Sequence, residues 1–105
     1  MKHSVAVLPF KNWSTNPEDG YFSDGVTEEI INALAQIQDL NVLARTSSFA
    51  FRTHEMDVQM VGRQLGVDTV LQGSIRRDQN RVRISAQLIN VETGYHLFST
   101  AYDRP

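Results

Sequence analysis

The run Val5–Phe10 is the feature that most constrains the fold of this chain. Consecutive side chains of a strand point to opposite faces of a sheet. A strand that is apolar on both faces has to be covered on two sides, as in the centre of an α/β sheet. The stretch Lys11–Gly20 is rich in turn-forming residues, and we expect it to be a loop. An acidic, apolar helix pattern follows, so the chain opens as an α/β unit.

The first helix is predicted to begin with Ser23 or Asp24 as its N-cap, because either side chain can accept a hydrogen bond from the free amides of the first turn. Asp39 and Asn41 are expected to end it. Apolar residues at helical spacing predict one buried stripe. The stripe is formed by Val26, Ile30, Ala33 or Leu34, and Ile37.

A second, short helix is predicted to follow Asp57 as its N-cap and to end at Gly66. Its shared apolar face consists of Val58, Val61, Gly62 and Leu65. Between the helices, Leu40–Ala44 has the pattern of a strand. The segment 45–51 has two interpretations, because its hydroxyl residues can cap a short helical turn or continue the strand.

From Thr69 onward the apolar period changes from helical to two residues, which predicts strands. Turns at 78–80 and 92–94 separate the strands Thr69–Arg77, Arg81–Asn90 and Tyr95–Tyr102. The predicted order is β-α-β-α-β-β-β. The fold class is therefore α/β, a mixed five-stranded sheet with two helices and a C-terminal antiparallel meander.

Composition narrows the function classes. The 105 residues are 41% hydrophobic with a net charge of −2, which fits one globular domain and gives no general attraction to nucleic acid. There is no cysteine, so disulfides, thiolate metal sites and a cysteine nucleophile are excluded. No stretch approaches the roughly 20 apolar residues of a membrane span. We expect residues 1–105 to be one domain of a larger multidomain chain, without direct membrane insertion.

No catalytic, metal or cofactor-binding residue is predicted. The three histidines have no metal-ligand spacing, the serines at 47 and 48 lack a nucleophile motif, and Glu28 and Glu29 point in different directions on a helix. Capping is favoured for Ser47, Ser48 and Asp24, although Asp24-Gly25 before a helix could bind an anion. No cofactor is therefore expected.

Candidate residues for an interaction surface form three groups. The arginines Arg76, Arg77, Arg81 and Arg83 are expected on a solvated hairpin, with an acidic protein partner as the second interpretation and nucleic acid disfavoured. Trp13, Tyr21 and Phe22 are expected to staple the loop onto the helix, or else to form an aromatic contact surface. The strand Tyr95–Tyr102, with Phe98 and Thr100, has no Lys, Glu or Pro to block an open edge, so we expect an interface there.

Five blocks in order give the chain a family resemblance over nearly its whole length. They are Val5–Phe10 with Asn12, Tyr21–Ile30, Ala44–Ser48, Leu65–Asp68 with Leu71–Arg77, and Arg81–Ile89 with Thr93-Gly94 and Tyr102–Arg104. Together they resemble the TolB amino-terminal-like domain of bacterial signalling proteins. Phe98 stands where that family often has Trp, and Trp13 where Leu is common. The resemblance implies an α/β accessory domain without catalytic residues.

The resemblance also implies a function. The expected function is a non-catalytic regulatory or protein-interaction domain of an adenylate/guanylate cyclase-type protein with tetratricopeptide repeats. The alternatives are a sensor domain of a membrane-linked transcriptional regulator and a small-ligand module with a cleft near Asp24 and Ser47. Expected partners are other domains of the parent chain, other proteins or a second copy, and not nucleic acid. The periplasmic side of a membrane-anchored parent is favoured over the cytoplasm.

Overall fold

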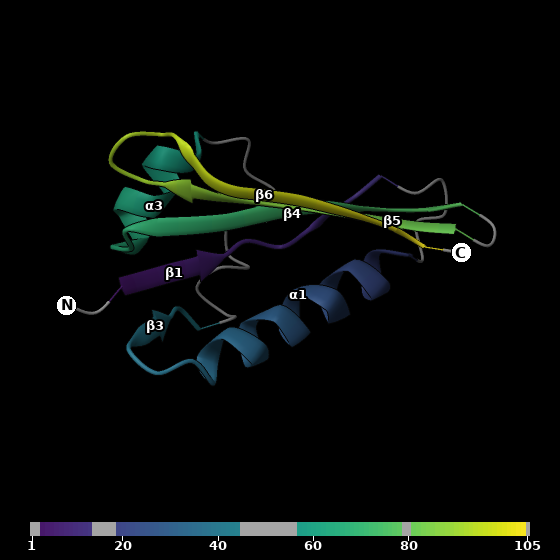
Figure 1. Ribbon diagram of the computed structural model, residues 1–105, viewed down its shortest axis with the longest axis horizontal. Helices are drawn as coiled ribbons and strands as arrows, with labels where there is room; N and C mark the ends of the chain where they lie inside the picture. The colour runs from purple at the N-terminus through teal and green to yellow at the C-terminus, as the bar shows by residue number, and fades with distance from the viewer. Residues whose placement is uncertain (1–2, 14–18, 45–56, 79–80, 105) are drawn as a thin grey trace.

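The computed structural model describes residues 3–13, 19–44, 57–78 and 81–104. Two helices and six strands form the described part of the chain (Figure 1). In chain order they are β1 His3–Val7, β2 Lys11–Asn12, α1 Asp19–Ala35, β3 Leu40–Val42, α3 Val58–Leu65, β4 Thr69–Asp78, β5 Arg81–Asn90 and β6 His96–Arg104. The two interpretations of 45–51, with Ser47 and Ser48, lie outside the described residues, as does His54.

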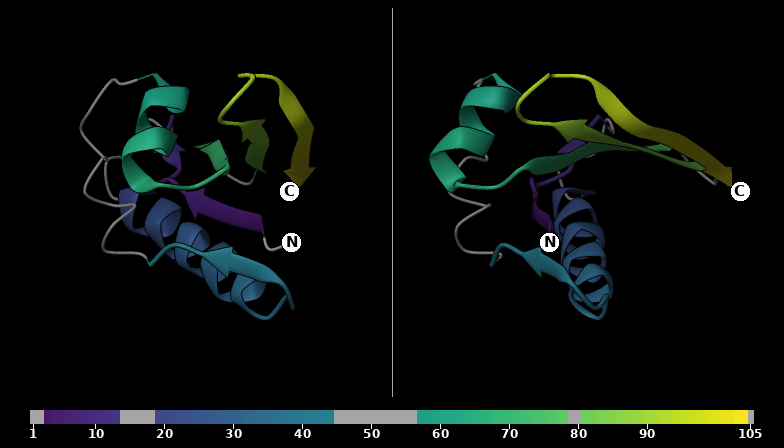
Figure 2. Two further views of the ribbon diagram at one scale, coloured as in Figure 1. Left: turned by 90° about the vertical axis from the view of Figure 1, so that its left-hand side faces the viewer. Right: turned by 60° about the vertical axis from the view of Figure 1, so that its left-hand side comes forward.

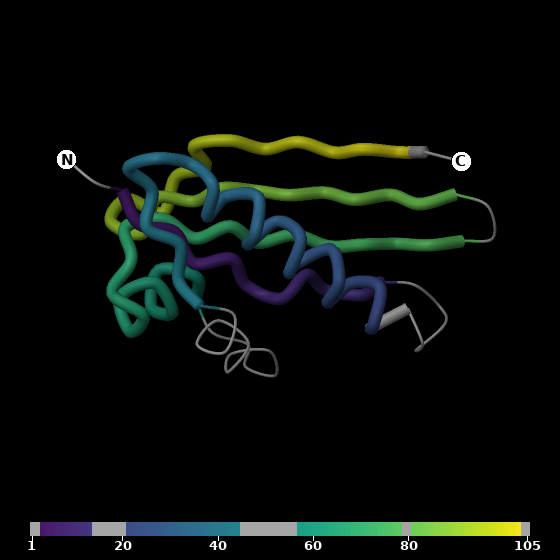
Figure 3. The backbone as a smooth tube through the Cα atoms, turned by 90° about the horizontal axis from the view of Figure 1, so that it is seen from below, coloured from purple at the N-terminus to yellow at the C-terminus, as the bar shows by residue number. Residues whose placement is uncertain are grey.

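The strands form one mixed sheet in the order β3-β1-β4-β5-β6. β1 is an interior strand, parallel to both β3 and β4, while β4, β5 and β6 form an antiparallel meander. The predicted α/β fold with a mixed sheet and a C-terminal meander is confirmed. The meander strands are longer than β1, and they extend to one side of the molecule (Figure 3).

A short strand lies in the stretch that was expected to be a loop. β2 pairs in parallel with β4, with Lys11 opposite Ser74 and Asn12 opposite Ile75. Pro9 cannot donate a ladder hydrogen bond, so regular pairing of β1 ends at Val7. The chain then returns to the same neighbour, and β2 is the sixth strand of the sheet.

The predicted start of the first helix is wrong. α1 begins at Asp19, so Ser23 and Asp24 lie inside the helix and neither is its N-cap. Tyr21 and Phe22 belong to the helix as well, and they do not precede it as a staple requires. Ser23 is buried against the rest of the fold, which explains why a residue with capping chemistry stands there in the helix interior.

The buried stripe of α1 also differs from the expected one. Ser23, Thr27 and Ile31 are its buried residues, spaced four apart along one face. Val26, Ile30 and Leu34 are partly buried beside that stripe, whereas Ile37 is exposed beyond the helix end. The apolar pattern of the sequence therefore predicted the residues beside the buried stripe of α1. The stripe itself contains two hydroxyl residues, Ser23 and Thr27.

Each helix covers one face of the sheet (Figures 1 and 2). Val7, Phe10, Ile31 and Ile75 form the core on the α1 side. Ala6, Val67, Val70 and Val91 form the core on the other side, where Val58 and Leu65 of α3 pack against them. β1 supplies consecutive residues to the two cores, as its apolar run predicted.

The predicted boundaries of α3 are confirmed. The Asp57 carboxylate accepts a hydrogen bond from the Gln59 amide at 2.9 Å, and Gly66 ends the helix in the left-handed conformation with φ of 73°. Gly62 lets α3 approach the loop after β5, because a Cβ there would lie 2.3 Å from a methyl carbon of Val91. This contact holds the β5–β6 turn against the helix.

Candidate interaction surface

β6 is a long edge strand. It hydrogen-bonds to β5 along one side, and its other side has no partner strand in the residues the structure describes. The opposite edge, β3, has only three residues, whereas β6 has nine. Free amides and carbonyls along an edge strand can pair with another chain.

The side chains of β6 are exposed on both faces of the sheet. Leu97, Phe98 and Tyr102 are each more than half exposed, and Thr100 is half-buried. Tyr95, just before the strand, is exposed as well. Large apolar groups that gather on one exposed element indicate an interaction surface more strongly than scattered ones do.

The register assigns Phe98, Thr100 and Tyr102 to the face of the sheet that α1 covers. They lie opposite Leu88, Ala86 and Ile84 of β5, in that order. Ile84 and Ala86 pack against the core on the α1 side. α1 itself packs mainly against β1, β2, β3 and β4 (Figure 2, right), so the β6 residues of this face stay accessible.

α1 contributes an apolar flank of its own. A shallow open hollow on the helix is lined by Tyr21, Phe22, Gly25, Val26, Glu29, Ile30 and Ala33. Val26 and Ile30 pack against the core that Ile84 and Ala86 also contact. Tyr21 is 85% exposed, so it does not pack back on the fold as a staple requires. The contact-surface interpretation of the aromatic residues stays a prediction.

Trp13 and Phe22 each lie near a cation. The Lys11 ammonium is 6.0 Å from the centre of the Trp13 ring, and the Arg77 guanidinium is 5.6 Å from that of Phe22. Both distances are within the range of cation–π attraction. Trp13 is exposed next to β2, away from the β6 edge.

The four arginines do not form one cluster. Arg76, Arg81 and Arg83 lie on the sheet face opposite α1, whereas Arg77 lies on the α1 face opposite Val82. Arg76 pairs with Asp78 at 3.0 Å, and Arg81 pairs with Asp103 of β6 at 2.9 Å. Strand alternation places Arg76 and Arg77 on opposite faces, but the hairpin register decides which of the two shares a face with Arg81 and Arg83.

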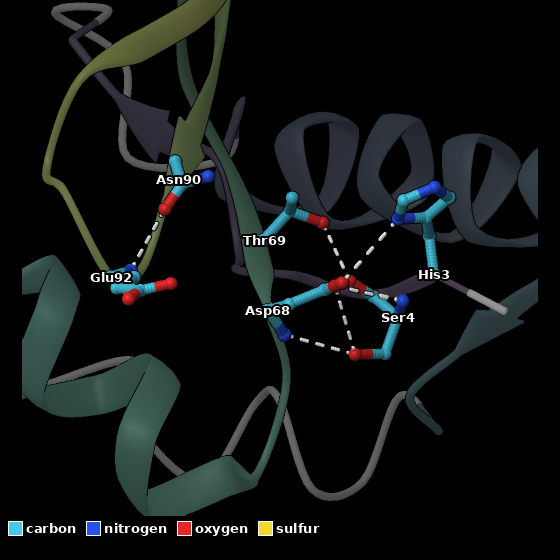
Figure 4. A network of polar contacts seen from close by, with 6 residues as sticks. All are labelled: His3, Ser4, Asp68, Thr69, Asn90 and Glu92. Atoms are coloured by element: carbon cyan, nitrogen blue, oxygen red, sulfur yellow. Dashed lines mark hydrogen bonds and ion pairs between the residues drawn. The ribbon is translucent and has the colours of Figure 1, made fainter. Parts of the chain in front are cut away.

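The turn between β5 and β6 is held by side-chain hydrogen bonds. The Asn90 amide oxygen accepts from the Glu92 amide at 2.9 Å (Figure 4). It also accepts from the Thr93 amide at 3.0 Å. Gln59 of α3 donates to the Val91 carbonyl at 3.1 Å. Gly94 has φ of 78°, which favours glycine. β6 therefore begins from a fixed turn that is anchored to α3.

A polar network joins the first residues of β1 to those of β4 (Figure 4). The Asp68 carboxylate accepts hydrogen bonds from the Ser4 amide and hydroxyl, at 2.8 and 3.0 Å. The Thr69 hydroxyl donates to the Ser4 carbonyl at 2.6 Å, and His3 Nδ1 is 3.5 Å from Asp68. Burial alone would raise the pKa of Asp68, but these hydrogen bonds and His3 hold it below its ordinary value.

A second open hollow lies beside this network. Its polar lining includes His3, Arg63, Asp68, Asn90 and Glu92. The ligand cleft expected near Asp24 and Ser47 stays a prediction, because Ser47 lies outside the described residues. Asp24 lies on α1. None of the helices in the described ranges is long and apolar enough to cross a membrane.

A small mixed α/β domain with an accessible edge strand is the class of protein that these features define. The chain belongs to the family described as HilA/YgeH-like transcriptional regulator, second domain, whose model matches residues 1–103. It is also 53% identical over 103 residues to a protein of Rhizobium meliloti (strain 1021) named "Putative adenylate cyclase 3". That match covers 98% of this chain but spans only 18% of the relative's length.

Solved structures of low sequence identity share the fold. The LpoB C-terminal domain from Salmonella enterica is 19% identical with a TM-score of 0.74, covering 97% of this chain and 82% of that one. TolB from Acinetobacter baumannii is 14% identical with a TM-score of 0.67, covering 100% of this chain and 24% of that one. PelC from Paraburkholderia phytofirmans, described as a dodecamer, is 18% identical with a TM-score of 0.64. The match covers 98% of this chain and 71% of the PelC chain.

The predicted resemblance to TolB is therefore confirmed for the fold, while the family is that of a regulator's second domain. The relative's name agrees with the expected link to cyclases. The tetratricopeptide repeats of the parent chain stay a prediction.

Proposed function

We propose that this chain is a non-catalytic regulatory domain that acts through protein contacts within a larger bacterial signalling protein. The observation that carries the proposal is β6, a nine-residue edge strand on which the large apolar side chains of Leu97, Phe98 and Tyr102 are exposed. Main-chain pairing along such an edge gives affinity, and the alternating side chains give specificity. Membership in a family of regulator domains supports the same function.

The proposed host is an adenylate cyclase-type protein with tetratricopeptide repeats. High identity to a cyclase-named relative, of which the domain spans a small part, supports a role beside other modules. The second candidate host is a membrane-linked transcriptional regulator, which the family description favours. A periplasmic position of the domain stays a prediction for either host, and a compartment-specific reporter fused after residue 105 of the full-length protein tests it.

If the domain acts through protein contacts at β6, substitutions on β6 should change the signalling output of the full-length protein. Substitutions elsewhere on the surface should leave it unchanged. The test compares Phe98→Lys with Met60→Lys in the full-length protein. Both variants replace an exposed apolar residue by a cation, one on β6 and one on α3. We expect only Phe98→Lys to change signalling output. Unchanged output in both folded variants would contradict the proposal.

The fold of PelC, described as a dodecamer, supports self-association as one mode of contact for this architecture. The partners proposed for β6 are other modules of the parent chain, another protein, or a second copy of the domain. Nucleic acid is not a proposed partner, because three of the four arginines share a face on which the described residues include no Phe, Tyr or Trp that could stack on bases.

A further inference from the structure

We propose that the partner of β6 is a second copy of this chain, paired antiparallel along β6 around a two-fold axis that passes through Thr100. The sheets of the two copies then form one continuous sheet. This inference rests on the proposed contact function and adds to it the identity of the partner and the register of the pairing.

The edge of β6 is suitable for strand addition along its length. Natural edge strands are protected by Lys or Pro, by inward charges or by being short. β6 has nine residues, and the stretch Tyr95–Tyr102 contains no Lys, Glu or Pro. A bulge in the β5–β6 ladder lies near its beginning, between the pairs of Leu88 and Ile89, so Phe98–Arg104 pairs regularly.

The order of residues around Thr100 is self-complementary. In antiparallel pairing centred on Thr100, Phe98 of one copy lies opposite Tyr102 of the other, and Ser99 lies opposite Ala101. The two-fold axis produces the Phe98–Tyr102 pair twice, both on the α1 face of the sheet. Aromatic residues directly opposite each other are among the pairs that stabilise antiparallel sheets.

Other registers lack this match. Centring the pair on Ala101 places Thr100 opposite Tyr102 and Ser99 opposite Asp103, so both aromatic pairs are lost. A slip by one residue places side chains of the α1 face opposite those of the other face, which the pleat does not allow. Within Leu97–Asp103, the Thr100-centred register brings no two like charges opposite each other.

β6 is already ordered for pairing in the single copy. The Asn90 turn fixes the start of β6. Near its end, Arg81 Nε and Nη2 both donate to Asp103 Oδ1, at 3.2 and 2.9 Å, and hold β6 against β5. Ordering before association lowers the entropy that association loses. The outer edge therefore presents its backbone groups in the geometry that a second β6 needs.

Single-cysteine variants test the register, because the chain contains no cysteine of its own. Cα atoms of directly opposite residues are about 4.5–5.5 Å apart, which allows a disulfide. We expect Thr100→Cys to form a disulfide-linked dimer under mild oxidation, and a mixture of Phe98→Cys with Tyr102→Cys to give the mixed dimer. Leu97→Cys is the matched control, since its copies are six positions out of register, roughly 20 Å apart.

Equal crosslinking of the Leu97→Cys and Thr100→Cys variants would overturn the inference. So would the absence of crosslinking in Thr100→Cys and in the Phe98→Cys/Tyr102→Cys mixture when circular dichroism shows folded protein. Light scattering supplies an independent measurement: the unmodified chain should approach twice the monomer mass as concentration rises, and the Phe98→Lys/Thr100→Lys variant should stay monomeric. A folded chain that remains monomeric, combined with altered output of the Phe98→Lys parent protein, rejects the second copy as partner and leaves the contact function standing.

Discussion

Thr27 is the residue that fastens α1 to the segment between β1 and β2. It is fully buried, and its hydroxyl accepts a hydrogen bond from the Phe10 amide at 3.0 Å while donating to the Ser23 carbonyl at 2.9 Å. A buried amide without a partner costs about 1–3 kcal/mol. Thr27→Val should therefore lower the free energy of unfolding by that amount in urea titrations.

Thr27→Ser is the matched control, because it keeps the hydroxyl and removes one methyl group, a loss of about 0.8 kcal/mol. Equal stability of Thr27→Val and the unmodified protein would mean that the Phe10 amide finds another partner.

Gly73 stands where β4 has no room for a side chain. A Cβ there would lie 2.3 Å from the Ser85 carbonyl oxygen and 2.5 Å from the Phe10 ring. Gly25 in α1 has nothing within 4 Å of the same position, and alanine favours a helix interior by roughly 0.5–1 kcal/mol. We expect Gly73→Ala to lower the thermal midpoint and Gly25→Ala to leave it equal or raise it. A stable Gly73→Ala protein would contradict this packing.

Asp68 links stability to pH. Because its folded-state pKa is lowered, its carboxylate stabilises the folded state at every pH above the ordinary value of about 3.9, and this contribution is lost as the pH falls through the folded-state pKa. Asp68→Asn should therefore show a smaller loss of stability on acidification than the unmodified chain. Glu29→Gln, an exposed change on α1, serves as the control. Identical acid profiles for Asp68→Asn and the unmodified protein would refute this role.

At the scale of elements, the sequence predicted best where local signals and tertiary contacts agree. Asp57, Gly66 and the two-residue alternation of β4 and β5 each have one structural meaning, and each prediction is confirmed. The start of α1 was mispredicted because Ser23 has the chemistry of a cap but is buried in a helix interior. β2 was missed because its pairing depends on a neighbour more than 60 residues away, Ser74 opposite Lys11.

The capping prediction belongs to the same scale and now applies to Asp57 alone. Asp57→Ala should destabilise the protein by about 0.5–2 kcal/mol through loss of the bond to the Gln59 amide, while Asp57→Asn should retain most of the stability. Urea unfolding measures both, and the m-value should stay constant. Equal losses in the two variants would show that the charge, and not the cap, is responsible.

The candidate surface was predictable in part. The lack of protective residues in Tyr95–Tyr102 indicated an open edge, and the sheet order places β6 at that edge. Which side chains share a face could not be read from sequence, because the bulge between Leu88 and Ile89 changes the register of the first part of β6. The β4–β5 register, which places Arg77 opposite Val82, separates Arg77 from the other three arginines.

At the scale of the whole molecule, the two helices and the β1–β4 region form a packed body, from which the meander extends and leaves β6 accessible (Figure 2). The domain can thus contact a partner through main-chain groups without rearranging its core. β6 is joined through its turn to Gln59 of α3, and through Asp103 to Arg81 of β5. A displacement of β6 by a bound partner would therefore be passed on to α3 and β5.

Hydrogen exchange of the β6 amides tests the central claim, that this edge is a protein contact, most directly. Exchange should be measured for the dilute 105-residue chain and for the same residues inside the full-length protein. We predict that the amides on the outer edge of β6 exchange quickly in the dilute chain and slow markedly in the full-length protein, while the interior strand β1 is protected in both. Equal, fast exchange of β6 in the two samples would contradict the account.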